Sequence, residues 1–172
     1  MLVIRNSTES DVPALALLAR VTFSETFGHL FRDRQDLLDY LDQTFSVDKL
    51  KSSLQKPNNR FWMAFYEDLS VGYAKVKFNS TSPFLEMQKK LCQLQKIYVL
   101  QDFLPKKIGV QLWSSLLGDV RSEGFGTMWL SVYDDNVRAI RFYEKQDFVY
   151  IGKHRFQIGK EDFGFQAMAK RL

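Results

Sequence analysis

The chain has 172 residues with 45% hydrophobic content and a formal net charge of +4. That length supplies one well-buried core and is short for two, so we expect a single domain over residues 1–172. No run of about 18 apolar residues occurs, and the first residues lack a signal-peptide pattern, which predicts a cytoplasmic protein without membrane insertion. One cysteine and two histidines exclude an internal disulfide and make a metal site unexpected.

The charge is unevenly distributed along the chain. Residues 23–48 hold six acidic side chains against two arginines, a net of −4, which leaves +8 on the rest of the chain. A solvated helix surface would explain this acidic segment, and so would a cation-binding face beside an anion-binding one. The overall positive charge suits an anionic ligand, which a nucleotide, a nucleic acid or a membrane surface could each provide.

The hydrophobic periodicity predicts alternating helices and strands. Thr8, with Asp11 three residues later and Pro13 behind it, is typical of a helix entry, and Ser46 suits the cap of a later helix. In chain order the expected elements are a strand at 2–5, a helix from residue 8 to about 27, helices at 36–45 and after 46, strands at 60–67 and 71–78 around a turn at 67–70, a loop or short helix at 79–91, a strand at 92–99, a helix at about 106–123, a strand at 127–133, a helix at 136–146 and two last strands around Gly159.

The strand expected at 92–99 has an irregular pattern. Its apolar side chains occupy two runs of alternate positions that are out of phase with each other: Cys92, Leu94, Ile97 and Val99. A β-bulge around Gln95-Lys96 would produce this slip, and bulges bend a strand and leave backbone groups unpaired for a ligand. An ordinary strand whose Lys96 merely extends its ammonium group to solvent is the alternative.

The stretch YVLQDFLPKKIGVQLW at 98–113 passes from a strand into an amphipathic helix through a cationic turn. An apolar face with a four-residue repeat indicates that the helix begins near Lys106: Ile108, Leu112, Leu116 and Val120. The first N–H groups of a helix lack internal partners and lie at the positive end of its dipole, so a phosphate finds donors and a favourable field there. Lys106 and Lys107 add charge and Gly109 lets the backbone approach closely, which predicts a pyrophosphate-bearing ligand.

Farther along, N-x-x-A-x-x-F-Y-x-K-x-x-F at 136–148 places Asn136 as a helix cap and Tyr143 near the end of that helix. With the strand, loop and helix before it, this segment resembles the GCN5-related N-acetyltransferase superfamily over nearly the whole chain. TFSETF at 22–27, VGYAKVKF at 71–78 and the ending FQAMAKRL resemble bacterial spermidine and spermine acetyltransferases. The resemblance implies a mixed α/β fold: a central, largely antiparallel twisted sheet of about seven strands, flanked by helices, with a splayed, bulged strand at the cofactor site.

The resemblance also implies a site for acetyl-CoA. The backbone of the bulged strand would pair with the pantetheine arm at Ile97, Tyr98 and Val99. Tyr143 would be the general acid that protonates the leaving thiolate. The remaining cofactor contacts would come from the loop that wraps the pyrophosphate and from the following helix: Leu104, Pro105, Lys106, Lys107, Ile108, Gly109, Val110, Asn136, Ala139 and, near the nucleotide end, Lys145.

Three positions depart from the family's usual pattern. The family loop is commonly Gln or Arg, two residues, Gly, one residue, then Gly or Ala; here Leu104 takes the first position and Lys107 the first glycine, while Gly109 matches. A lysine at that point can direct its side chain outward, where its charge favours phosphate. Asp147 stands where glycine often precedes the phenylalanine, and aspartate tolerates the left-handed conformation at modest cost.

The sequence does not identify a general base. Gln93 and Gln95 occupy the strand on which many relatives carry glutamate, and neither can accept a proton at useful pH. A water chain leading to Glu25, Glu86 or bulk solvent could serve instead. Glu25 is also the best acidic candidate for holding a cationic amine, with an ordinary surface charge as the alternative, and His29 is expected to be a loop residue.

We therefore expect an enzyme that moves the acetyl group of acetyl-CoA to a primary amine, a polyamine such as spermidine or spermine, by direct attack in a ternary complex. An acyl-enzyme on Cys92 is the alternative mechanism. A catalytically silent CoA-binding sensor or interaction module, and an acetyltransferase for a peptide or another small amine, are alternative functions. No nucleic-acid motif accompanies the scattered basic residues, so neither a nucleic-acid nor a membrane partner is expected, and a homodimer is left open.

Overall fold

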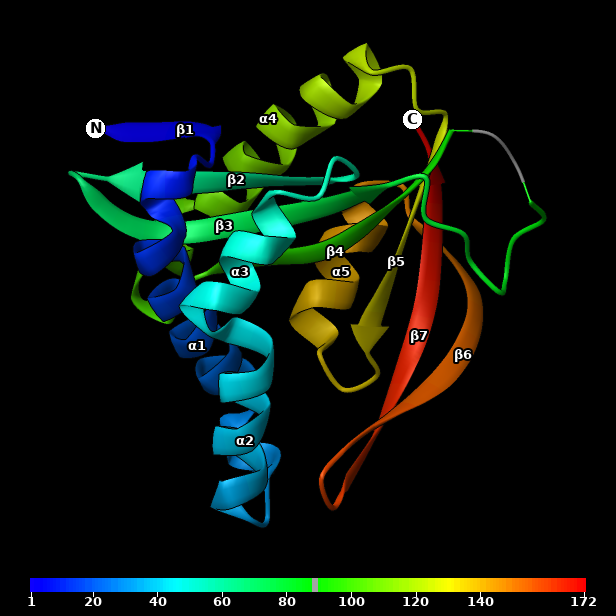
Figure 1. Cartoon of the computed structure of the whole chain (residues 1–172). Coiled ribbons are helices and arrows are strands. Elements are labelled where there is room, and N and C mark those ends of the chain that lie inside the picture. Colours follow the sequence, from blue (N-terminus) through cyan, green and yellow to red (C-terminus); the bar gives the residue numbers. More distant parts are fainter. Residues whose placement is uncertain (88–89) are drawn as a thin grey trace.

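The computed structural model describes residues 1–87 and 90–172, which contain a seven-stranded sheet (Figure 1). The strands are β1 Leu2–Asn6, β2 Asn59–Tyr66, β3 Leu69–Phe78, β4 Leu91–Val99, β5 Thr127–Tyr133, β6 Val149–Ile158 and β7 Glu161–Arg171. Their order across the sheet is β1-β2-β3-β4-β5-β7-β6. Neighbouring strands are antiparallel except β4 and β5, which run parallel. The expected mixed, largely antiparallel sheet is confirmed.

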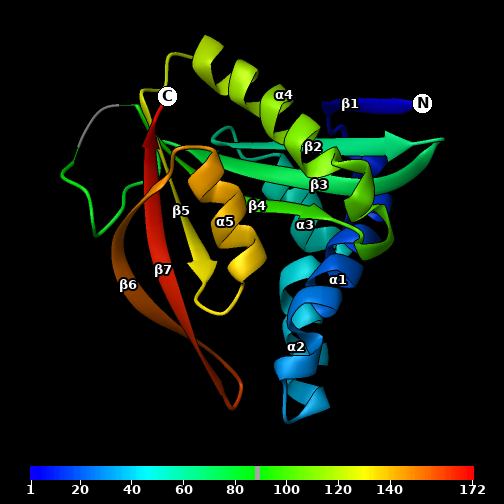
Figure 2. The same cartoon turned by 180° about the vertical axis from the view of Figure 1, so that it is seen from behind.

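Helices cover both faces of the sheet. They are α1 Val12–Phe27, α2 Arg34–Phe45, α3 Val47–Leu54, α4 Ile108–Ser122 and α5 Val137–Lys145. Figure 1 shows α1, α2 and α3 in front of the sheet, and Figure 2 shows α4 and α5 on its other face. The α1 face buries a core that includes Phe23 and Phe61, and the α4 face buries one that includes Trp62 and Leu116. Within residues 1–87 and 90–172, no helix is both long and apolar enough to cross a bilayer.

Side-chain caps explain where several helices begin. The Thr8 backbone N–H donates to Asp11 Oδ2 (2.7 Å), and a 3-10 turn at Glu9–Asp11 leads into α1. Ser46 Oγ accepts from the third backbone N–H of α3 (3.2 Å), as expected. Asp33 caps α2, whose start at Arg34 is two residues earlier than the apolar pattern indicated. Helix boundaries therefore follow the capping residue where it and the hydrophobic pattern disagree.

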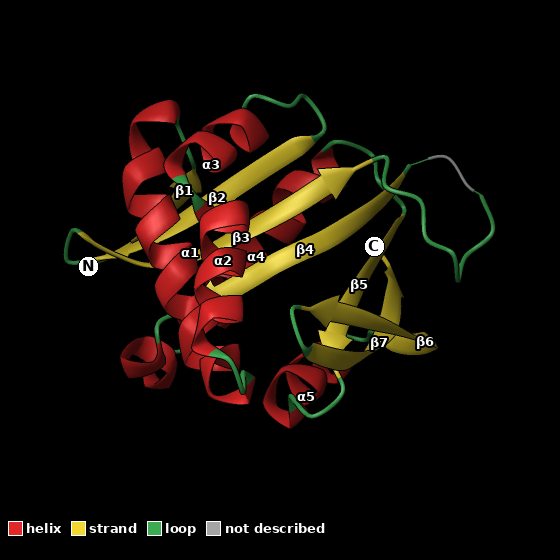
Figure 3. Cartoon of the chain, turned by 60° about the horizontal axis from the view of Figure 1, so that its bottom comes forward, coloured by secondary structure: helices red, strands yellow, loops and turns green. Residues whose placement is uncertain are grey.

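β4 contains the predicted bulge. Lys96 and Leu94 pair with consecutive residues of β3, so Gln95 is the extra residue. On its other side β4 pairs with β5 only over Leu91–Gln93. Beyond that point the two strands diverge, as Figure 3 shows, and the sheet opens between β4 and β5. This divergence is what gives a ligand access to the middle of the fold.

Two boundaries differ from expectation. The helix expected from about residue 106 begins as a 3-10 segment at Gln101–Lys106, and α4 starts only at Ile108 because Lys107 has a φ of 55°, which interrupts the helix. The turn between β2 and β3 is tighter than predicted and consists of Glu67 and Asp68, both with positive φ. Of the loop or short helix expected at 79–91, the described part before β4 is loop, and residues 88–89 lie outside the described residues.

The acidic segment at 23–48 contacts the hairpin of β6 and β7. The Lys160 backbone N–H donates to Asp36 (2.8 Å), and its ammonium group pairs with Asp33 (2.6 Å). Arg32 pairs with Glu161 at the start of β7 (2.9 Å). These contacts hold the start of α2 against the tip of the hairpin. Figure 1 shows this tip below the sheet.

Candidate active site

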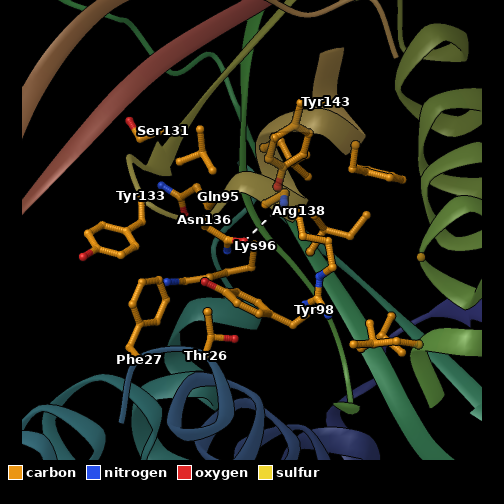
Figure 4. Close-up of a pocket in the computed structure, with 18 of the residues that line it drawn as sticks. Thr26, Phe27, Gln95, Lys96, Tyr98, Ser131, Tyr133, Asn136, Arg138 and Tyr143 are labelled. Atoms are coloured by element: carbon orange, nitrogen blue, oxygen red, sulfur yellow. Dashed lines mark hydrogen bonds between the residues drawn. The ribbon is translucent and has the colours of Figure 1, made fainter. Parts of the chain in front are cut away.

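A cavity of about 310 Å³ lies where β4 and β5 diverge (Figure 4). Its walls come from the end of α1, from β4 and β5, from the turn before α4 and from the first turns of α5. Figure 4 shows Tyr143 entering from α5 on the opposite side to Thr26 and Phe27 of α1. Segments far apart in the sequence therefore meet at one site.

Most of the residues that the sequence pointed to line this cavity: Ile97, Tyr98, Val99, Leu104, Lys107, Gly109, Val110, Asn136, Ala139 and Tyr143. The others lie elsewhere. Ile108 is buried against Ala64 and Val71, and Lys106 donates from its ammonium group to the Tyr66 hydroxyl (3.2 Å). Pro105 lies inside the 3-10 segment, and Lys145 lies in the last turn of α5.

Among the described residues, the edge of β4 that faces β5 has no strand partner beyond Gln93. The residues Ile97–Val99 on that edge line the cavity. On the opposite edge of β4, these three residues pair with Gly72–Ala74 of β3. Hydrogen bonds along that one edge therefore hold this part of the strand in place. An unpaired strand edge presents N–H and C=O groups that an extended ligand with amide groups can pair with.

The turn before α4 lies at one end of the cavity. Lys107, with φ 55°, adopts the left-handed conformation that glycine adopts most easily. Its N–H donates to Leu104 O (3.1 Å), and Val110 donates to Lys107 O (3.2 Å). The first N–H groups of α4 have no intrahelical partners. Because Arg138 lines the same cavity, a second cation accompanies Lys107.

Tyr143 lines the cavity and is a buried residue, with 9% of its surface exposed. The rings of Phe142 and Phe148 pack around it at centroid distances of 5.5 and 5.7 Å. Burial raises the pKa of Tyr143 well above its usual value of 10. The hydroxyl therefore stays protonated across the ordinary pH range.

The helix that carries Tyr143 begins and ends as the sequence predicted. Asn136 Oδ1 accepts from the Ala139 backbone N–H (3.2 Å), so Asn136 caps α5 while it lines the cavity. After the helix, Asp147 takes the expected left-handed conformation with φ 64°. These two local features fix the direction in which α5 projects Tyr143.

A serine–histidine pair that sequence reasoning missed lies on the β5 side. Ser131 of β5 lines the cavity, and its Oγ is 2.7 Å from His154 Nε2 on β6. The imidazole stacks on the Phe165 ring, with centroids 5.5 Å apart and an interplanar angle of 15°. β5 and β6 are both neighbours of β7 and not of each other, so only the strand order brings this pair together.

Lys96 also lines the cavity, although its sequence context suggested only a bulge or a solvent-reaching side chain. Figure 4 shows the side chain pointing into the cavity on the side of Tyr98 and Phe27. Its Nζ lies 5.5 Å from the Phe45 ring centroid. The residue is partly exposed, yet its ammonium group lies among protein atoms, and this burial lowers the pKa of Lys96 to about 8.

Glu25 lies outside this cavity and lines a neighbouring one of about 470 Å³, together with His29 and Asp135. The Glu25 carboxylate accepts from the Gln101 backbone N–H (3.0 Å), which ties α1 to the 3-10 segment. His29 lies in a short 3-10 turn at Gly28–Leu30. The carboxylate that the sequence favoured for an amine therefore has a structural contact of its own.

Within the described part of the chain, no carboxylate lines the first cavity. Gln95 lines it and donates to Gln93 Oε1 (3.1 Å), which also accepts from Ser80 (3.1 Å). Cys92 is fully buried and lines neither cavity. In residues 1–87 and 90–172, no group of three or more His, Cys, Asp or Glu side chains is arranged to hold a metal ion.

Comparison with known proteins gives the family. Residues 19–148 match the acetyltransferase (GNAT) family, and the chain belongs to that family. It is 25% identical over 154 residues to an uncharacterized N-acetyltransferase in the pepI 3′ region of Lactobacillus delbrueckii subsp. lactis, across 90% of this chain and 88% of the relative. It is also 27% identical over 149 residues to the uncharacterized N-acetyltransferase YjgM of Escherichia coli K12, across 87% and 83% of the two chains.

The fold is shared with solved acetyltransferases. The PaiA N-acetyltransferase of Thermoplasma acidophilum, solved in complex with coenzyme A, aligns with a TM-score of 0.77 and 19% identity over 100% of this chain and 99% of that one. The protein is thus an acetyl-CoA-dependent N-acetyltransferase. The cavity fits this cofactor because it combines an unpaired strand edge, a cationic turn and, among the described residues, no lining carboxylate that would repel phosphate.

Proposed function

We propose that the protein transfers the acetyl group to a primary amine by direct attack, in a complex that holds cofactor and amine together. The observation that carries this proposal is the position of Tyr143, a buried neutral hydroxyl in the same cavity as the unpaired edge of β4. Cys92, the single cysteine, lies outside the cavity, and burial raises the pKa of its thiol to about 12. Both facts favour direct transfer over an acyl-enzyme on this thiol.

Two parts of the site would hold acetyl-CoA, which supplies an activated acetyl group as a thioester when bound. The backbone of Ile97–Val99 would pair with the amide groups of its arm. The turn from Leu104 to Val110, at the N-terminus of α4, would bind its diphosphate, assisted by the charges of Lys107 and Arg138. Lys106 and Lys145, which lie outside the cavity wall, would act on the phosphates only at longer range.

Tyr143 would act as the general acid. Its Oη holds a proton at working pH, and the hydroxyl would give that proton to the leaving sulfur as the amine attacks. The raised pKa does not prevent this transfer, because a dry site also raises the pKa of a thiol, as it does for Cys92. Donor and acceptor are shifted in the same direction, so the proton transfer stays close to balanced.

The ammonium form of the acceptor must lose a proton before it can attack, and the Ser131–His154 pair would receive it. The Ser131 hydroxyl would accept the proton from the amine while donating its own to His154 Nε2, 2.7 Å away. This exchange leaves a neutral amine, an intact serine and a protonated imidazole. It fills the role that Gln93 and Gln95 cannot take, because an amide does not accept a proton at these pH values.

A polyamine acceptor is the narrower prediction from the sequence, and it rests on the acidic segment at 23–48. Asp33 and Asp42 of that segment form ion pairs with Lys160 and Arg20, and Asp36 accepts a hydrogen bond from the Lys160 backbone N–H. Glu25 and Asp135, which line the neighbouring cavity, would remain as carboxylates for a cationic amine. The support for a polyamine is therefore weaker than the support for a primary amine.

The decisive experiment combines turnover with cofactor binding. Tyr143→Phe is expected to lower kcat by about 10²- to 10⁴-fold, the usual contribution of a general acid, while the affinity for acetyl-CoA measured by calorimetry stays within about twofold. Tyr150→Phe, at a tyrosine of β6 that is 55% exposed, is the matched control and should change neither quantity. Bound cofactor without thiol release from any amine would instead identify a silent CoA-binding module.

The proton route has its own test. Ser131→Ala and His154→Gln should each reduce the rate near pH 7 by about tenfold or more, and the deficit should shrink toward pH 9.5, where more of the acceptor amine is already neutral. A deficit that is equal at both pH values would assign these residues a structural role only.

A further inference from the structure

Lys96 is a cation without a counter-ion at the acceptor side of the cavity. Successive side chains of β4 point to opposite faces of the sheet. Lys96 points to the face covered by α1 and α3, where its Nζ approaches the Phe45 ring, and Tyr98 packs against the core of the same face. Ile97 packs against the opposite core. Among the described residues, Lys96 has no hydrogen bond and no ion pair, although burying a charge is costly unless a partner compensates it.

A second lysine adjoins it. Lys75 of β3 pairs with Lys96 across the sheet, and its Nζ lies 5.4 Å from the ring of Phe61, a residue of the same α1-side core. Burial, and after it the charge of Lys96 and of three more lysines, Lys77, Lys56 and Lys49, together lower the pKa of Lys75 to about 8. None of these five lysines forms a salt bridge within the described part of the chain.

The cofactor does not account for these lysines. Its diphosphate would lie at the turn around Lys107. This turn adjoins the α4 face, because Gly109 of α4 lies next to Val99 of β4: a Cβ added at Gly109 would contact the Val99 side chain. Lys107 and Arg138 already supply positive charge at that end. Lys96, on the other face of β4, lies on the side from which the amine has to approach if Tyr143 and the cofactor occupy the α4 and α5 side.

A purely cationic acceptor does not suit this surface either. A polyamine would bring ammonium groups next to the Lys96 ammonium, and no lining carboxylate of the described chain offsets that repulsion. The carboxylates of the acidic segment that the structure pairs are engaged with Lys160 and Arg20. An acceptor that carries its own negative charge would instead supply the missing partner.

We propose that the acceptor is a small amine that also bears an anionic group, a carboxylate or a phosphate, and that Lys96 binds this group while the amine faces the thioester. The inference rests on the proposed function. Lys75 assists by its charge from the neighbouring strand, and the remaining lysines attract the anion toward the cavity. Lys96 thus acts as a residue that determines specificity.

Matched acceptors test the chemistry of the ligand. We would compare 4-aminobutanoate with 4-aminobutanamide and 1,4-diaminobutane, and phosphoethanolamine with ethanolamine, at equal concentrations of the neutral amine. The anionic member of a pair should have a KM lower by about 10- to 100-fold, the factor that one charge-assisted hydrogen bond supplies. The better of the carboxylate and phosphate arms identifies the anion. Equal KM values within each pair, or preference for the diamine, would overturn the inference.

Variants of Lys96 test the site. Lys96→Met should remove the preference for the anionic acceptor by raising the KM of phosphoethanolamine toward that of ethanolamine, whereas Lys96→Arg should retain most of the preference. Lys153→Met, at an exposed lysine of β6 that lines neither cavity, removes the same charge and is the control. A loss of kcat with neutral amines as large as with anionic ones would contradict a binding role and indicate a proton-transfer or structural one.

Binding measurements separate this inference from the function it rests on. Calorimetry of 4-aminobutanoate or phosphoethanolamine with the CoA-saturated protein should show an interaction that Lys96→Met abolishes and Lys153→Met retains. Absence of turnover with every amine would refute the proposed transferase reaction. Turnover of neutral amines or polyamines without a Lys96 effect would refute the anionic acceptor alone.

Discussion

Replacing Lys107 by glycine separates the backbone role of this position from its charge. Lys107 occupies the family's first loop glycine and takes the left-handed conformation that glycine would take, with φ 55°. The side chain is exposed, and the hydrogen bonds of its N–H and C=O to Leu104 and Val110 involve backbone atoms only. Lys107→Gly therefore removes strain and one positive charge without removing these contacts.

The two effects have opposite signs. A left-handed conformation costs a residue with a Cβ about 1–2 kcal/mol, and glycine returns about 0.5–1 kcal/mol of that through its greater unfolded-state entropy. The net gain of about 0.5–1 kcal/mol raises the Tm by roughly 1–4 °C for a chain of this size. If the diphosphate binds at this turn as we propose, loss of the Lys107 charge costs about 1 kcal/mol at an exposed position, or roughly a fivefold weaker Kd for CoA.

Thermal denaturation and calorimetric titration with CoA measure both quantities. Asp147→Gly is the control for affinity, because Asp147 has φ 64° at the other departure from family glycine, pairs with Lys170 (3.4 Å) and lies outside the cavity, so the Kd for CoA should not change. Asparagine tolerates the left-handed conformation, so Lys107→Asn should weaken the affinity for CoA without changing the Tm. In 0.5 M salt, which screens the charge, the variant and the wild type should have similar affinities. A less stable Lys107→Gly protein, or one with unaltered affinity, would refute the reasoning about this turn.

Three further predictions concern residues outside the cavity. Cys92→Ser should leave kcat within about threefold, because the buried thiol with its pKa near 12 takes no part in transfer, and a loss above a hundredfold in steady-state assays would restore the acyl-enzyme. Asp11→Asn should cost about 1–2 kcal/mol in urea denaturation at pH 7, since Asp11 accepts two hydrogen bonds from Arg5 (2.7 and 2.8 Å). Because this ion pair lowers the pKa of Asp11, the contribution is full above about pH 4 and is lost as the pH falls further, so an unchanged difference at pH 2 would contradict it. Gly159→Ala should cost about 1–3 kcal/mol, because its φ is 55° and an added Cβ meets the Asp36 side chain; an unchanged Tm would show that the hairpin can move away.

Much of the fold could be predicted because its signals are local. The slip of the apolar pattern in one strand predicted the bulge, which the structure places at Gln95. Capping residues located helix starts at Ser46 and Asn136, and the motif around Asp147 indicated its left-handed backbone. The start of α4 was misplaced because the left-handed state of Lys107 is imposed by the turn and carries no signal in a lysine.

The site was predictable only where it follows a linear motif. The segments around Ile97 and Tyr143 were predicted from their resemblance to the family's motifs, and they share one cavity. The Ser131–His154 pair escaped notice because its residues are 23 positions apart and meet only through the strand order. Lys96 was visible in the sequence, but only the folded chain shows that no ion pair forms with it among the residues that the structure describes.

The bulge connects these two kinds of information. Before Gln95, Cys92 and Leu94 of β4 pack into the α4-side core; after it, Ile97 faces that core instead, since one inserted residue exchanges the faces of everything downstream. In a regular strand Lys96 would share the face of Leu94 and its charge would enter an apolar core. The inserted residue turns Lys96 toward the face of Phe45, while the edge of the same strand that faces β5 is the one that we propose binds the cofactor. Within β4 the bulge therefore sets the face of Lys96, and the separation from β5 leaves open the strand edge that we propose binds the cofactor.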